Sequence, residues 1–149
     1  MDIAALEDEA ARQILPRFDE DIALKLGLIL LDLAKGLPVV INIRSANRTY
    51  FHAALPGSHA TNDNWARRKS NTALIMGHAS LLVGLRNAAK RRSLATDGLS
   101  EADYADHGGA VPIRVQGVGM VAVATISGLP QVEDHRLVAT GIAALARLS

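Results

Sequence analysis

Cysteine is absent from the 149 residues of this chain. Disulfides, thiolate nucleophiles, Cys-bound zinc and iron–sulfur clusters are therefore excluded. Aromatic residues make up only 3% of the chain, and Trp65 is the single tryptophan and the one aromatic within its most basic segment. The net charge is only +1, so the chain as a whole has no strong field to attract nucleic acid. We therefore expect no nucleic-acid partner.

Long hydrophobic runs are also missing. The most apolar stretch, residues 24–33, contains Lys25 and Asp32 and is about half as long as the roughly 20 residues that span a bilayer. The N-terminus is acidic and amphipathic, whereas a secretory signal needs a basic start followed by an apolar run. We expect no membrane association and a cytoplasmic location.

What is present is the composition of one globular domain, with 49% hydrophobic and 21% charged residues. We expect a single domain over residues 1–149. Hydrophobic periodicity and turn signals predict helices over 2–15, 20–35 and 130–148 and strands over 39–44, 48–53, 112–115 and 118–127. Residues 61–92 are helical in pattern but contain Gly77 and Gly84, so they form two helices or one kinked helix. A short helix is also expected over 101–104.

The order of these elements predicts the fold class. The strands come as two hairpins with helices grouped around them, which indicates an α+β fold with a mainly antiparallel sheet flanked by helices. A doubly wound parallel sheet would need strands and helices in alternation, and this sequence does not alternate in that way.

The first segment that could carry chemistry covers residues 62–71. Its candidate residues are Asp63, Asn64, Trp65, Arg68, Lys69 and Asn71. Helical spacing places Trp65 over Arg68 and Lys69, so that a cation could stack on the indole. Cations at a helix start oppose the helix dipole, which favours an anion pocket or a subunit contact that compensates them. The alternative is a capped helix with Trp65 in the core and solvated charges.

The second segment, residues 104–113, contains His107, Gly108 and Gly109. Paired glycines allow positive φ or a close backbone approach to a ligand. The alternative is that the glycines are simply the entry to a strand and that His107 is a surface residue.

The third segment, residues 127–135, joins a strand to a helix N-terminus, where free N–H groups bind anions. Its candidates are Ser127, Asp134 and His135. In the structural alternative, Ser127 caps the helix and Asp134 interacts with its dipole. Asp134 and His135 are adjacent on a helix and therefore point in different directions. No histidines have metal-ligand spacing, and neither HExxH, a P-loop nor GxGxxG is present, so no metal site is expected.

Charge is segregated along the chain. Residues 1–21 carry seven acids and two cations, and residues 62–92 carry seven cations and one acid. We expect the two regions to pair, either within one protomer or between protomers.

Four stretches together carry a family resemblance: FDEDIALKLG at 18–27, DNWARRKSN at 63–71, HGGAVPIRVQGVG at 107–119 and VATISGLPQVEDHRLV at 123–138. They resemble the haem-degrading-domain family, also called GlcG/HbpS-like, in the branch catalogued as an uncharacterised protein family. The resemblance implies a profilin-like fold and self-assembly into a homo-oligomer. The family name implies haem binding and degradation. A eukaryotic member of the branch is linked to a chaperone system for tail-anchored proteins.

These observations lead to three functional hypotheses. The first is an oligomer that binds a small ligand, either haem or another anion, with Arg68 and Lys69 holding a carboxylate or propionate and a histidine meeting iron or donating a hydrogen bond. The second is a non-enzymatic oligomeric adaptor or chaperone-linked interaction protein, with the same residues at a subunit interface, where Trp and Arg are favoured. The third is an enzyme, for which Asp134 and His135 are the best pair to test, although spacing alone defines no catalytic group.

Overall fold

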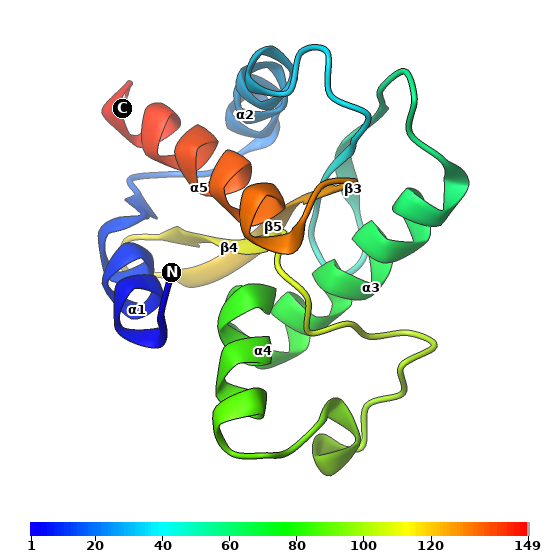
Figure 1. Ribbon diagram of the computed structural model, residues 1–149. Coiled ribbons are helices and arrows are strands. Elements are labelled where there is room, and N and C mark those ends of the chain that lie inside the picture. The colour runs from blue at the N-terminus through cyan, green and yellow to red at the C-terminus, as the bar shows by residue number, and fades with distance from the viewer. Residues whose placement is uncertain (149) are drawn as a thin grey trace.

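The computed structural model describes residues 1–148, and it confirms the α+β class (Figure 1). Its helices are α1 (Ile3–Arg12), α2 (Glu20–Leu33), α3 (Ala60–Met76), α4 (Ser80–Ala89), the 3-10 helix η1 (Leu94–Asp97) and α5 (Gln131–Arg147). Its strands are β1 (Ile14–Leu15), β2 (Val40–Arg44), β3 (Thr49–Ala54), β4 (Ala110–Val115) and β5 (Gly119–Ser127).

The five strands form one sheet in the order β1-β4-β5-β2-β3. The two predicted hairpins, β2–β3 and β4–β5, are antiparallel, and they join through an antiparallel β2–β5 pairing that places Val40 opposite Ser127. The tight turn of the second hairpin contains Gly117 at φ 76°, a left-handed conformation that glycine adopts without steric cost. Among the strands within residues 1–148, only the short β1 pairs in parallel, with β4.

Helices cover both faces of the sheet (Figure 1). Side chains of a strand alternate between faces, and β5 shows this directly. Ala124 and Ile126 lie in the main core with α2 and α5, whereas Val123 packs with Ala73 of α3. Helix α5 begins soon after β5 ends at Ser127, and Lys69 of α3 reaches Asp134 in the first turn of α5, so α3 and the start of α5 meet near this end of β5.

The end of the first predicted helix and the predicted helix at 101–104 are wrong. The first helix ends at Arg12 rather than at residue 15, and Ile14 and Leu15 pair as a strand with Arg114 and Val115 of β4. Pro16 disfavours helical backbone at the residue before it, and the edge of β4 supplies hydrogen bonds instead. Residues 101–104 form a turn and not a helix, and the short helix lies earlier, at η1.

The segment 61–92 consists of two helices. Gly77 ends α3 in the left-handed conformation at φ 72°, whereas Gly84 continues α4. Strand β4 begins at Ala110, two residues before the predicted start. The predicted cap at Asp19 is confirmed, since its carboxylate accepts a hydrogen bond from the amide of Ile22 at 2.9 Å. Within residues 1–148, no helix is both long and apolar enough to cross a membrane.

Candidate functional site

A pocket of about 240 Å³ lies between the first half of α3 and the loop that leads into α5. We call it the α3–α5 pocket. It is lined by residues from all three segments that the sequence singled out: Asn62, Trp65, Lys69, His107, Ser127, Gly128, Leu129, Gln131 and Asp134. Segments more than 60 residues apart in the chain therefore meet at one site.

The floor of the pocket holds a buried ion pair. Lys69 Nζ donates to Asp134 Oδ2 at 3.1 Å, and the two residues are 4% and 0% exposed. The Asp134 carboxylate also accepts hydrogen bonds from the amides of Gly128 at 3.2 Å and Leu129 at 3.0 Å. These two amides are thereby satisfied just before α5 begins.

Burial has the largest effect on the pKa values of Lys69 and Asp134. Desolvation raises the pKa of Asp134, and the nearby Lys69 ammonium and the two backbone donors oppose that rise. Desolvation lowers the pKa of Lys69, and Asp134 opposes that fall. Buried ionisable groups with shifted pKa values in a pocket are a recognised mark of functional sites.

The paired glycines allow protein segments to approach one another. A Cβ on Gly109 would lie 2.4 Å from the carbonyl oxygen of Ile126 and 3.0 Å from Lys69 Nζ, and the backbone there has φ +142°. A Cβ on Gly108 would lie 2.5 Å from the carbonyl oxygen of Gln131, whose side chain accepts a hydrogen bond from the Gly108 amide at 2.9 Å. Glycine is therefore required so that the chain can pass between Lys69 and the start of α5.

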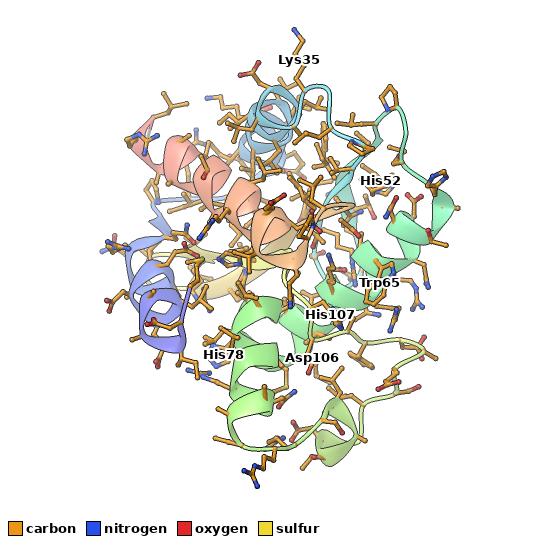
Figure 2. The ribbon with its side chains drawn as sticks, viewed as in Figure 1. Lys35, His52, Trp65, His78, Asp106 and His107 are labelled. Carbon is orange, nitrogen blue, oxygen red and sulfur yellow. The ribbon has the colours of Figure 1, made fainter. Side chains whose placement is uncertain are left out.

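Trp65 forms a wall of the pocket, and its surroundings confirm the predicted stacking. The Arg68 guanidinium carbon lies 4.3 Å from the indole centroid. The centroid of the His107 ring lies 5.1 Å from that of the indole, and the two ring planes are at 59°; Figure 2 shows Trp65 and His107 next to each other. Arg68 also donates from Nε to the carbonyl oxygen of Glu101 at 2.8 Å. Arg68 lines a neighbouring hollow of about 220 Å³ that shares Trp65 and His107 with the α3–α5 pocket. Of the two candidate cations, only Lys69 reaches the α3–α5 pocket.

Three predicted residues of α3 lie outside the pocket and have structural partners. Asp63 binds the ring of His52 at 2.8 Å. The side-chain oxygen of Asn64 accepts hydrogen bonds from the guanidinium of Arg67. Asn71 donates to the carbonyl oxygen of Asp103 at 2.8 Å and thereby helps to hold the turn at 101–104.

His135 is also outside the pocket. It is fully buried, and its Nε2 lies 2.6 Å from Oε1 of Glu9 in α1. The expected divergence of Asp134 and His135 is therefore present: one side chain faces α3 and the other faces α1. The two do not form an acid–base pair.

Sequence reasoning did not select Asn62, Gly128, Leu129 and Gln131, which also line the pocket. The signal that could have found three of them is the strand-to-helix segment itself, because a loop that closes over a helix start presents several consecutive residues. The structural alternative in which Ser127 caps the helix is wrong. Pro130 precedes α5 without a side-chain cap, and Asp134 reaches back to the loop amides instead.

Among the described residues, no group of three or more His, Cys, Asp or Glu side chains could hold a metal ion. The chemistry that the site offers is instead that of a buried ammonium beside a carboxylate, an indole wall and a histidine at the rim.

Comparison with known proteins identifies relatives over nearly the whole chain. A UPF0303 protein of Streptomyces coelicolor is 47% identical over 139 residues, which cover 91% of this chain and 88% of that protein. A UPF0303 protein of Acidobacterium capsulatum is 40% identical over 150 residues, which cover 99% of this chain and 91% of that protein. The crystal structure of the Ybr137w protein has a TM-score of 0.91 at 33% identity, with 99% of this chain and 89% of that chain covered.

More distant solved structures share the fold. The structure of a PduOC:heme complex has a TM-score of 0.72 at 21% identity and covers 85% of this chain and 94% of that one. The structure of HbpS has a TM-score of 0.68 at 20% identity and covers 87% of this chain and 89% of that one. The family model described as haem degrading protein HbpS-like matches residues 18–143. The chain therefore belongs to the HbpS-like haem-degrading protein family, and its similar relatives include uncharacterised UPF0303 proteins.

Proposed function

We propose that the chain is a small-ligand-binding protein whose α3–α5 pocket takes a small molecule with a carboxylate group. The observation that carries this proposal is the buried ammonium of Lys69 on the pocket floor. An ammonium has three donors, and Asp134 is the one hydrogen-bond partner of Lys69 within residues 1–148. Buried donors in folded proteins are normally satisfied, so oxygen atoms of a ligand would complete the set.

Two further features favour a carboxylate. Helix α5 begins at the pocket with Gln131, and the N-terminal end of a helix favours negative charge. Trp65 supplies an apolar wall against which the hydrocarbon part of the ligand would pack, and its contacts with Arg68 and His107 hold the ring in position. Ligand sites commonly combine an apolar wall with a few convergent polar groups in this way.

Haem is the ligand that the relatives suggest, because the family description names haem degradation and one similar solved structure is a heme complex. The pocket of one protomer does not fit the macrocycle. Its volume of about 240 Å³ is below that of most sites for drug-sized ligands, roughly 300–1,000 Å³, and its floor is an ion pair. Of the two histidines predicted for the site, His135 is turned away and bound to Glu9. A propionate-sized carboxylate suits the pocket better than a porphyrin does.

The test is a titration of the purified protein with acetate, pyruvate, succinate and benzoate, followed by calorimetry and by the fluorescence of the single tryptophan. We expect saturable binding of at least one carboxylate and at least a tenfold loss of affinity in Lys69→Gln. Lys25→Gln, at an exposed position of α2, is the matched control and should bind as the wild type does. Unchanged affinity in a folded Lys69→Gln variant would refute the proposal.

Because removal of Lys69 could impair folding, carboxylate binding is also measured in His107→Ala, which changes an exposed residue at the pocket rim. We expect this variant to fold and to bind the carboxylate more weakly. Haemin is titrated in parallel against a protein-free control. A saturable Soret shift with no carboxylate binding would replace the proposed ligand with haem.

We also propose that the chain forms a homo-oligomer through α2. Leu24 and Leu28 are 50% and 56% exposed and lie one helical turn apart on that helix. A self-complementary apolar stripe is the kind of surface that a second copy covers in a two-fold contact. Light scattering should show an assembly in the wild type and a lower mass in Leu24→Lys/Leu28→Lys. Trp65→Ala should keep the wild-type mass, because Trp65 packs within its own protomer; a monomer there would favour an interface at the pocket instead.

A further inference from the structure

A second hollow, of about 260 Å³, lies against α4 and the chain that follows it. We call it the α4 pocket. It is lined by Met76, His78, Val83, Arg86, Asn87, Lys90, Arg92 and Asp97, and it shares no lining residue with the α3–α5 pocket. In Figure 2, His78 lies on the opposite side of α4 from His107. The two pockets are therefore separate sites.

The lining of the α4 pocket carries an excess of positive charge. Arg86, Lys90 and Arg92 are cationic, and Asp97 is the one acid among the lining residues. Asp97 pairs with Arg92, and Arg86 pairs at 3.2 Å with Glu7, a half-exposed residue of α1. Lys90 has no ion-pair partner within residues 1–148. Among the described residues, the lining therefore carries a positive charge that no acid pairs with.

Arg92 has unused donor capacity in this pocket. Its Nε is buried and has no hydrogen-bond partner within the described part of the chain. The backbone explains its position: Arg91 has φ 52°, in the left-handed region that is uncommon for residues other than glycine. The chain thereby reverses after α4, and the Arg92 amide bonds back to the carbonyl oxygen of Asn87 at 2.9 Å. Arg92 therefore lines the pocket, and its buried Nε–H has no partner within the described residues.

The pKa of His78 is lowered in part by the same positive charge. Burial lowers its pKa, and so do the charges of Arg86 on α4 and Arg114 on β4, while Glu7 on α1 opposes them. Arg114 is fixed nearby because its guanidinium donates to the carbonyl oxygen of Gly77 at 2.7 Å. A multivalent anion in the pocket would offset these like charges.

We infer that the α4 pocket binds the phosphate group of a small phosphate monoester. Arg92 and Lys90 would hold the phosphoryl oxygens, since a guanidinium fork matches phosphate geometry and an ammonium adds a point charge. A phosphate carries close to two negative charges at neutral pH and three acceptor oxygens. Asp97 and Glu7 already pair with two of the three cations, but a phosphate can contact the unpaired Lys90 and the Arg92 guanidinium together, and it offers one more acceptor oxygen than a carboxylate does. Met76 and Val83 provide an apolar wall for the organic part.

The test uses calorimetry and ³¹P NMR on the full chain, with glycerol phosphate and inorganic phosphate as separate probes. We expect both to bind, glycerol phosphate more tightly, and Arg92→Gln to lower the affinity at least tenfold. Arg91→Gln is the matched control, because it removes an exposed arginine next to Arg92 that does not line the pocket. Equal losses in the two variants, or no binding to the wild type, would overturn the inference. Equal affinity for the two probes would overturn the assignment of the ligand as a phosphate monoester and would assign the site to free phosphate.

Two further measurements keep the inference independent of folding and of the first pocket. Lys90→Gln changes an exposed residue and should weaken phosphate binding without loss of structure. Saturating phosphate should raise the pKa of His78 in an NMR titration of the wild type, because the bound dianion offsets Arg86 and Arg114. An unmoved His78 titration would contradict binding at this place. His107→Ala, the exposed rim variant of the α3–α5 pocket, should leave phosphate affinity unchanged, so failure at one pocket says nothing about the other.

Discussion

Lys69 Nζ and Asp134 Oδ2 lie 3.1 Å apart, although the two residues are separated by 65 positions in the chain. This ion pair fastens α3 to the start of α5, and it is buried. Pairs of this kind have a high cost when one partner is removed, because the other charge remains without compensation in a region of low dielectric constant.

Lys69→Met should therefore lower the free energy of unfolding by about 3–5 kcal/mol, the range for breaking a buried pair. The double variant Lys69→Met/Asp134→Asn should recover much of that loss, since an amide carries no charge and its oxygen can still accept the Leu129 amide. Urea unfolding of the wild type, both single variants and the double variant measures this. Additive losses would show that the two side chains do not interact energetically.

The contact between Glu9 and His135 should contribute to the docking of α1. Glu9→Ala would leave both ring nitrogens of His135 buried without a partner, because Nδ1 already has none in the described structure. We expect a loss of about 1–3 kcal/mol, the cost of an unsatisfied buried polar group. Asp8→Ala removes an exposed neighbouring acid and should change the unfolding midpoint little. A similar loss in both variants would indicate a general charge effect and not this contact.

Gly84 should tolerate no side chain, although it lies within a helix. A Cβ there would be 2.0 Å from the carbonyl oxygen of Asp106. The gain in helix propensity from Gly84→Ala is about 1 kcal/mol, whereas overpacking a close contact costs about 1–3 kcal/mol and a backbone clash more. We expect net destabilisation in thermal unfolding. Gly98→Ala, with no atom within 4 Å but φ +76°, measures the backbone strain of a new methyl group alone and should be milder.

His78 should make stability depend on pH in the mildly acidic range. Its pKa in the folded protein is lowered from the ordinary value of 6.5. At pH values between the folded and the unfolded pKa, the unfolded chain therefore binds more protons than the folded one. Stability should then rise with pH up to about 6.5 and gain nothing more from this residue above that. His78→Gln should show a smaller rise in urea midpoint from pH 5 to 7. The same rise in both proteins would assign the effect to other groups.

Much of the fold was predictable from short-range patterns. Asp19 caps α2 as expected, Gly117 turns between β4 and β5, and Gly77 separates α3 from α4. The stacking of Arg68 on Trp65 also followed from helical spacing. Each of these features depends on residues within a few positions of one another, so their energetics are contained in the local sequence.

The errors lie where distant partners decide the conformation. Ile14 and Leu15 are apolar residues at helical spacing, yet the free edge of β4 pairs with them as a strand. The turn at 101–104 is held by side chains of α3, among them Asn71. Such competition depends on which backbone groups are nearby after folding, and sequence periodicity carries no information about that.

The sequence by itself determined the α+β class, the two hairpins, the family and the three segments from which a site could be built. The tertiary structure alone decided how the candidate residues divide. Lys69 and Asp134 form an ion pair on the floor of a pocket. His135 instead contacts Glu9, and Asp63 contacts His52. For Lys69, Asp134 and His135 the physical reason is that a buried polar or charged group must find a partner wherever the packed elements bring one. That choice is made across the core and not along the chain.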